Sequence, residues 1–254
     1  MIESFGQDDH GPSEIRGDRF AARVISRSRK DWRMTETTTA PAVSRAATAT
    51  EVDIRIEDDA TPLVRLIGRT LRDAARAGHV LPAPQESAAT VAIRSHDTPQ
   101  AATITFGSGT VDVSSGVLVE PDATLTVDLN ARFAPTSDPS GDADLAAGAL
   151  LALSPPVPDW RTAAEHFWNA GRSVPGFPDV LIAVTEGPEG LEQVVLGDGE
   201  THYLIAGAPE TLAGVFSGSD DLLAVLSSGV LGIQGTLSQL SVMIGASWKV
   251  RYDV

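Results

Sequence analysis

The sequence predicts an α+β protein in which a largely antiparallel sheet is covered by short helices. Polar and apolar side chains alternate at 110–113 and 124–129, as expected for strands of a sheet with one wet and one packed face. A helix over 63–77 has clear start and stop signals. Between 201 and 250, strand-like and helix-like signals follow one another with few residues between them.

The clearest helix has Thr61 as its cap, Pro62 at the first helical position and Gly78 as its terminator. Its arginines recur at helical spacing and form a positive stripe, made of Arg65, Arg69, Arg72 and Arg76. Such a stripe contacts a membrane surface or an anionic ligand, or it is either a solvated face or one that pairs with the acidic body of the protein. We favour the second interpretation, because the apolar face of this helix has no Trp or Phe to anchor in lipid.

Strands and further helices are expected on both sides of this helix. A short extended stretch at 52–56 precedes it, and strands at 88–94, 102–106, 110–114 and 123–129 follow as an antiparallel meander. Two apolar helices are expected at 144–153 and, capped by Asp159, at 160–170. Strands at 180–185 and 191–196 then lead to a strand at 201–205 and a helix that begins at Pro209 and stops at Gly218.

The C-terminal stretch continues with a second short helix. Ser219 and Asp220 are good N-cap residues, and Asp221 places a carboxylate in the first turn. Its apolar residues at 222–226 cover most of the circumference, so we expect burial on more than one side. The periodicity beyond Ile233 fits either a last strand or a strand-helix-strand passage.

The order of these signals resembles the C-terminal half of the sterol carrier protein 2 sterol-transfer family. The matching residues are 220–226, Ser228-Gly229 and Ile233-Gln234-Gly235, which fit a mainly apolar and glycine pattern over about 50 residues. The resemblance implies a sheet covered by helices, with a cavity that holds a sterol, a fatty acid or an acyl-CoA.

The helix, break, helix and glycine order of 144–176 parallels that of 212–235, which favours two degenerate copies of one unit. We therefore expect a disordered tail and linker at 1–50, a first sterol-carrier-like unit at 51–178 and a second at 179–254. The alternative is one domain over 51–254, in which 63–130 and 180–250 contribute to a single sheet. Met34 is followed by a Thr/Ala-rich stretch that resembles a natural start, so the true start of the chain is either Met1 or Met34.

Composition limits the function classes. The chain has 254 residues, a formal net charge of −15 and no cysteine. An acidic body repels phosphate backbones, so nucleic acid is not expected as a partner, and the lack of cysteine excludes thiolate nucleophiles and disulfides. No apolar stretch is long enough for a membrane span. We therefore expect a cytoplasmic protein. Arginine greatly outnumbers lysine, which is typical of a bacterial protein from a GC-rich genome. The tail has a small basic cluster, made of Arg27, Arg29, Lys30 and Arg33, which either contacts a membrane or nucleic acid or, as we favour, is solvated.

Catalytic and metal-binding patterns are weak. The five histidines are far apart, and none has the spacing of a metal-binding motif. Asp198, Glu200 and His202 are the best acid-base candidates, but they lie at a Gly-rich hairpin turn, where such residues also occur for conformational reasons. We expect no enzyme activity, no metal and no cofactor.

The expected function is therefore non-enzymatic binding or transfer of a hydrophobic ligand between the sheet and the C-terminal helices. The residues expected to line this site are large and apolar: Phe167, Trp168, Phe216, Leu222, Leu226, Ile233 and Met243. The alternative is a structural or protein-protein interaction domain, in which the same side chains fill the core and a protein is the partner.

Overall fold

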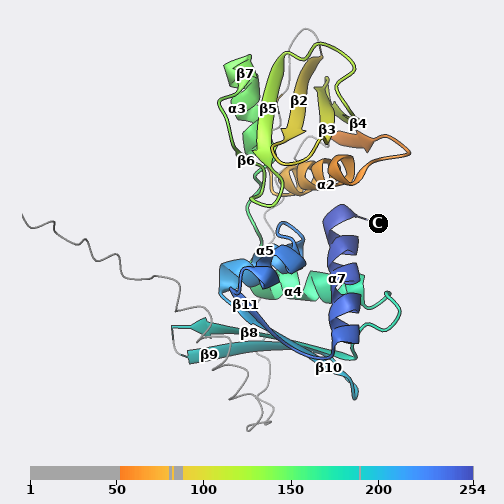
Figure 1. Ribbon diagram of the computed structural model, residues 1–254, viewed down its shortest axis with the longest axis vertical. Helices are drawn as coiled ribbons and strands as arrows, with labels where there is room; N and C mark the ends of the chain where they lie inside the picture. Colours follow the sequence, from red (N-terminus) through yellow and green to blue (C-terminus); the bar gives the residue numbers. More distant parts are fainter. Residues whose placement is uncertain (1–51, 80–81, 83–87, 189, 254) are drawn as a thin grey trace, which may run out of the picture.

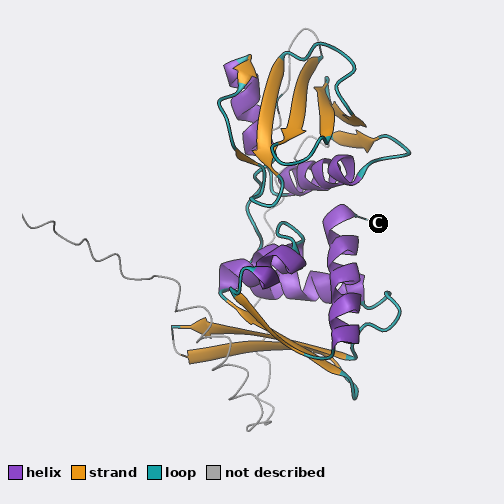
Figure 2. Ribbon diagram, in the orientation of Figure 1, coloured by secondary structure: helices purple, strands orange, loops and turns teal. Residues whose placement is uncertain are grey.

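The computed structural model describes residues 52–79, 82, 88–188 and 190–253. Within these residues the chain is α+β, with six helices and two mixed sheets, which confirms the expected fold class. The sheets form two stacked units, and α2 of the first unit and α4, α5 and α7 of the second lie between them (Figures 1 and 2). The expected disorder of 1–50 and the basic cluster at Arg27–Arg33 lie outside the described residues.

The first unit has one seven-stranded sheet with two helices. Its elements are β1 (Asp53–Ile56), α2 (Pro62–Arg76), β2 (Ala89–Ser95), β3 (Ala101–Phe106), β4 (Thr110–Ser115), β5 (Ala123–Asp128), β6 (Ala134–Pro135), β7 (Ser140–Gly141) and α3 (Ala143–Ala152). The strand order is β1-β4-β3-β2-β5-β6, and β7 also pairs with β5. The inner face packs on α2 and α3 in one apolar cluster.

The expected meander is correct for β2, β3 and β4, which pair antiparallel in sequence order. It is wrong for β5, which pairs parallel with β2 on the other side of the hairpin. A parallel neighbour requires a crossover in place of a hairpin. Residues 116–122 provide it, and the side chain of Leu118 within them is 89% exposed.

The second unit has a four-stranded sheet covered on one face by helices. Its elements are α4 (Trp160–Gly171), β8 (Val180–Gly187), β9 (Gly190–Gly197), β10 (His202–Gly207), α5 (Pro209–Ser217), α6 (Leu222–Ser227), β11 (Leu231–Gln234) and α7 (Leu237–Tyr252). The strand order is β11-β10-β8-β9. Because the strands of the two units form separate sheets, the single-sheet alternative is wrong.

The two sheets share one connection. In the second unit β10 follows the β8–β9 hairpin and pairs parallel with β8, and in the first unit β5 pairs parallel with β2 in the same way, but only after β4 has extended the β2–β3 hairpin by one strand. This agreement is compatible with an internal duplication, which stays a prediction. Helix α4 packs in the apolar cluster of the second unit, whereas a division at residue 178 would assign it to the first.

The structure differs from the sequence-based expectations at two places in the C-terminal stretch, the range after β11 and helix α6. After β11 the chain forms one long helix, α7, with a capping box between Thr236 and Gln239, so neither the expected last strand nor the expected strand-helix-strand passage forms in this range. Helix α6 is capped by Asp221, whose side chain accepts from the backbone N–H of Ala224 at 2.9 Å. Only Leu222 of α6 is buried, so this helix is not buried on several sides.

Candidate functional site

Six of the seven residues expected to hold a ligand meet at the seam between the second sheet and its helices, but their side chains largely fill it. Phe167, Phe216, Leu222 and Met243 are at most 1% exposed and belong to one apolar cluster. Trp168 and Ile233 pack against this cluster, while Leu226 is half-buried on α6.

Aromatic rings occupy the centre of the seam. The ring centroids of Phe167 and Phe216 are 5.3 Å apart, and the ring of Phe177 is 6.1 Å from that of Phe167 and 5.4 Å from that of Trp168. These separations are typical of rings in direct contact. At this seam the geometry therefore favours the filled-core alternative.

Tyr203 on β10 is buried in the same cluster, a position that the sequence did not mark. Its side chain is 0% exposed, and its hydroxyl has no hydrogen-bond partner in the described part of the chain. Burial disfavours the phenolate, which raises the pKa of Tyr203 to about 12.

This pKa gives a test in alkaline solution. The unfolded chain releases the Tyr203 proton near pH 10 and the folded chain near pH 12, so stability from this group is intact below pH 10 and falls as the pH rises from there to about 12. The loss is at most about 1.4 kcal/mol per pH unit. We expect Tyr203→Phe to remove this part of the pH dependence in urea unfolding at pH 8 to 11. An unchanged slope would contradict the assignment, and Tyr252→Phe is the control.

A cavity lies at the junction of the two units, away from the seam. Its volume is about 350 Å³. The first unit contributes residues of α2 and of the turn after β5, the link between α3 and α4 forms another wall, and Ser219 comes from the second unit. The lining residues are Leu66, Arg69, Thr70, Asp73, Leu129, Ala131, Arg132, Phe133, Ala134, Leu153, Ser154, Pro155, Val157 and Ser219.

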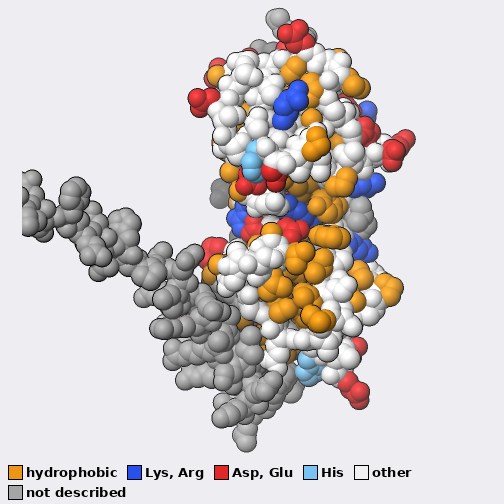
Figure 3. Space-filling view, in the orientation of Figure 1, with side chains coloured by type: hydrophobic (Ala, Val, Ile, Leu, Met, Phe, Trp, Pro, Cys, Tyr) orange, Lys and Arg blue, Asp and Glu red, His pale blue; other side chains and the backbone are white. Residues whose placement is uncertain are grey.

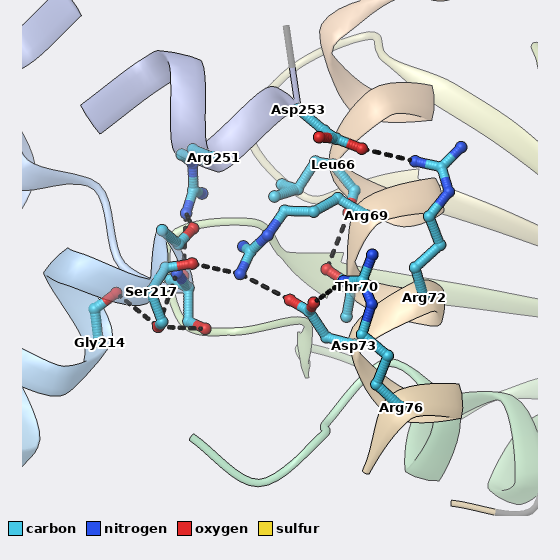
Figure 4. Close-up of polar contacts among 12 residues, drawn as sticks. Leu66, Arg69, Thr70, Arg72, Asp73, Arg76, Gly214, Ser217, Arg251 and Asp253 are labelled. Atoms are coloured by element: carbon cyan, nitrogen blue, oxygen red, sulfur yellow. Dashed lines mark hydrogen bonds and ion pairs between the residues drawn. The ribbon is translucent and has the colours of Figure 1, made fainter. Parts of the chain in front are cut away.

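Arg69 is the charged group buried in the wall of this cavity. It is 9% exposed, it pairs with Asp73 at 2.7 Å, and its other contact is a hydrogen bond donated to the carbonyl oxygen of Ser217 (Figure 4). Burial lowers the pKa of Arg69, although the nearby Asp73 acts in the opposite direction. One buried cation therefore joins α2 to the second unit and faces the cavity.

A second ion pair closes one side of the cavity. Arg132 donates to Asp220 through Nε at 2.7 Å and Nη2 at 2.5 Å, and this hydrogen bonding raises the pKa of Arg132. The pair lies against Gly214 on α5, where an added Cβ would collide with the Asp220 carboxylate. The absence of a side chain at Gly214 thus allows the close approach, and Asp220 serves this pair and not the expected cap of α6.

Arg251 at the end of α7 ties the same region together. It is 2% exposed and donates to the carbonyl oxygens of Gly218 at 3.0 Å, Ser219 at 2.9 Å and, across the junction, Leu129 at 2.9 Å. Arg72 on α2 pairs with Asp253 at 3.0 Å. Figure 3 shows charged side chains gathered at this waist of the molecule.

All four arginines of the α2 stripe contact protein carboxylates or carbonyls. Arg65 donates to the carbonyl oxygen of Ala60, Arg76 pairs with Asp73, and Arg69 and Arg72 make the contacts given above, as expected for a face that pairs with the acidic body. Asp198, Glu200 and His202 lie exposed at the turn between β9 and β10, and a catalytic role for them stays untested. Among the described residues, no group of three or more His, Asp or Glu side chains is placed to hold a metal ion. No described helix is long and apolar enough to cross a membrane.

No family model and no curated protein matches the chain. One solved structure similar to part of it is that of a conserved hypothetical protein from Thermus thermophilus, described as a possible sterol carrier protein. The two are 14% identical, and the similarity covers 37% of this chain and 82% of the other, with a TM-score of 0.25. A similarity of this extent does not assign the chain to a family.

Proposed function

We propose that the chain is a non-enzymatic binding protein for a hydrophobic small molecule, such as a sterol or a fatty acid, and that the ligand lies in the cavity at the junction of the two units. The observation that carries this proposal is the volume of about 350 Å³ between the units. Small-molecule sites are commonly found between domains and have volumes of about 300–1,000 Å³. The seam beside the second sheet is filled, so we move the expected site to the junction.

The lining of the cavity suits such a ligand. Its walls are mostly apolar, through Leu66, Leu129, Phe133, Leu153 and Val157. Burial of about 200 Å² of apolar ligand surface would contribute about 5 kcal/mol. Arg69 and Thr70 add a polar corner that could hold one oxygen-bearing group of the ligand. The volume suits a single tail or ring system better than a complete acyl-CoA.

The proposal is tested with a fluorescent fatty-acid probe and with native mass spectrometry of the purified chain. We expect micromolar binding, and we expect Val157→Trp to weaken it at least tenfold, because the indole would occupy the cavity. Leu118→Trp is the control, since Leu118 is 89% exposed and does not line the cavity. Absence of both probe binding and a co-purified lipid would refute the proposal.

A structural or protein-interaction role is the second candidate, and the filled seam supports it. Hydrophobic side chains also gather on the surface of the second unit in the view of Figure 3, and on α7 Leu237 is 84% and Trp248 46% exposed. Exposed apolar groups of this kind are typical of protein contact surfaces. A partner captured by the native chain but not by a Leu237→Ser, Trp248→Ser variant would favour this candidate over ligand binding.

A further inference from the structure

The outer face of the second sheet, turned away from its helices, is apolar. Because side chains alternate along a strand, Leu181 and Ala183 of β8 face the helices, and their neighbours face outward. The outward residues form a separate apolar cluster, made of Val180, Ile182, Val184, Leu204 and Ala206. Leu191 and Val195 of the edge strand β9 extend it, because Glu186 pairs with Leu191 and Ile182 with Val195 in the β8–β9 register.

The first sheet provides a comparison within the same chain. Its outward positions are mainly polar, with Thr90, Arg94, Thr105, Asp112 and Thr126 at alternate places along the strands. An outer face of that kind is stable in water, whereas a face of Val, Ile and Leu is not. The second sheet therefore has the composition of a sheet that is covered on both faces.

The described helices of the second unit cover only one of these faces. Figure 2 shows α4, α5 and α7 on the side toward the first unit. The side chains of Val180, Ile182, Val184 and Leu204 are nevertheless each 4% exposed. No element in the described part of the second unit accounts for this burial, so the cover has to be sought elsewhere.

We propose that the outer face of the second sheet is an intramolecular docking surface for residues 14–30 of the same chain. These residues contain the apolar side chains Ile15, Phe20, Val24 and Ile25, together with six basic and two acidic residues. Residues 154–253 contain twelve acidic and four basic residues, a net charge of −8. The segment is thus complementary to the outer face in apolar composition and to the second unit as a whole in charge.

Acidic side chains at both ends of the face strengthen this match. Glu186 lies exposed at one end of β8, and Asp179 and Asp198 lie exposed at the other. The chain between the segment and β1 is also long enough, because about 20 extended residues span roughly 65 Å. Apolar burial would then provide the affinity, and the arginines would fix the position at the rim.

The absence of cysteine makes a clean test possible in the full chain. Ile182→Cys places a thiol on the outer face, and Ala183→Cys places one on the inner face of the same strand. Adding Phe20→Glu and Val24→Glu should raise the thiol-labelling rate of the Ile182→Cys protein at least tenfold and leave that of the Ala183→Cys protein unchanged. Thr37→Glu with Thr39→Glu, outside the segment, is the matched control and should change neither rate.

Two outcomes would overturn the proposal. One is an Ile182→Cys labelling rate that is the same with and without the Phe20 and Val24 substitutions. The other is protection that disappears on dilution, because a second copy of the chain would then cover the face. If Ile182→Cys itself perturbs folding, Val195→Cys on the neighbouring edge strand gives the same comparison, since Val195 lies opposite Ile182 in the register.

Discussion

Replacing Phe167 with alanine is expected to lower the free energy of unfolding by about 3–5 kcal/mol. The Phe167 side chain is completely buried, and its ring contacts those of Phe216 and Phe177. Its removal would lose the transfer energy of the ring and leave a cavity that α4 and α5 cannot close without moving. Urea unfolding followed by circular dichroism measures the effect.

The same variant separates the two possible ligand sites. Leu151→Ala is the stability control, because Leu151 is 57% exposed on α3 and should change the free energy of unfolding by less than about 0.5 kcal/mol. If the ligand lies at the junction, Phe167→Ala should leave the affinity for the fatty-acid probe within about twofold at a temperature where the variant is folded. A small stability loss together with a large change in affinity would show that the seam holds the ligand.

Replacing Arg251 with alanine is expected to lower the free energy of unfolding by about 2–4 kcal/mol, the second largest effect among these predictions. Three carbonyl oxygens, those of Leu129, Gly218 and Ser219, would lose a charge-assisted donor in a region from which water is largely excluded. One of these bonds crosses the junction, so the two units should also separate more readily. Protease cleavage within the proline-containing link at 154–158 should therefore accelerate together with the loss of stability.

Two controls accompany this prediction. Lys249→Ala removes a cation from the same helix end, where its one described hydrogen bond is to Ser173 at the surface, and it should change stability by less than about 0.5 kcal/mol. Arg251→Lys keeps the charge but cannot reach all three carbonyls with a planar fork, so it should recover only part of the loss. Full stability in Arg251→Ala would mean that these bonds contribute nothing to the junction.

Local signals predicted most helices and strands because each depends on a few neighbouring residues. Thr61, Pro62 and Gly78 define α2 almost to the residue, and Asp159 caps α4 as expected. Gly218 ends α5 in the left-handed conformation that favours glycine. The clearest local error concerns the range of α7, for which no single continuous helix was predicted. Apolar residues lie on several sides of this helix, so its sequence does not show the periodicity of a helix with one apolar face.

The candidate site was harder to predict because it is built from distant segments. The apolar residues near 167, 216 and 243 were correctly placed together, but whether they line a space or fill one depends on ring-to-ring packing. The junction cavity joins α2, the turn after β5 and the α3–α4 link. Arg69 was noted only as part of a stripe, and nothing in its local pattern distinguishes it from the exposed Arg76.

By itself the sequence determined the α+β class, most element boundaries and the acidic, cysteine-free character of the chain, since these follow from composition and short-range periodicity. Only the tertiary structure decided that the strands divide into two sheets, that β5 pairs with β2 and that a cavity lies between the units. Those features depend on which apolar faces meet and which buried charges find partners. The hydrogen bond from Arg69 to the carbonyl oxygen of Ser217 is an example. A buried arginine is stable only where other groups accept its hydrogen bonds, and Ser217 is far from Arg69 in the sequence.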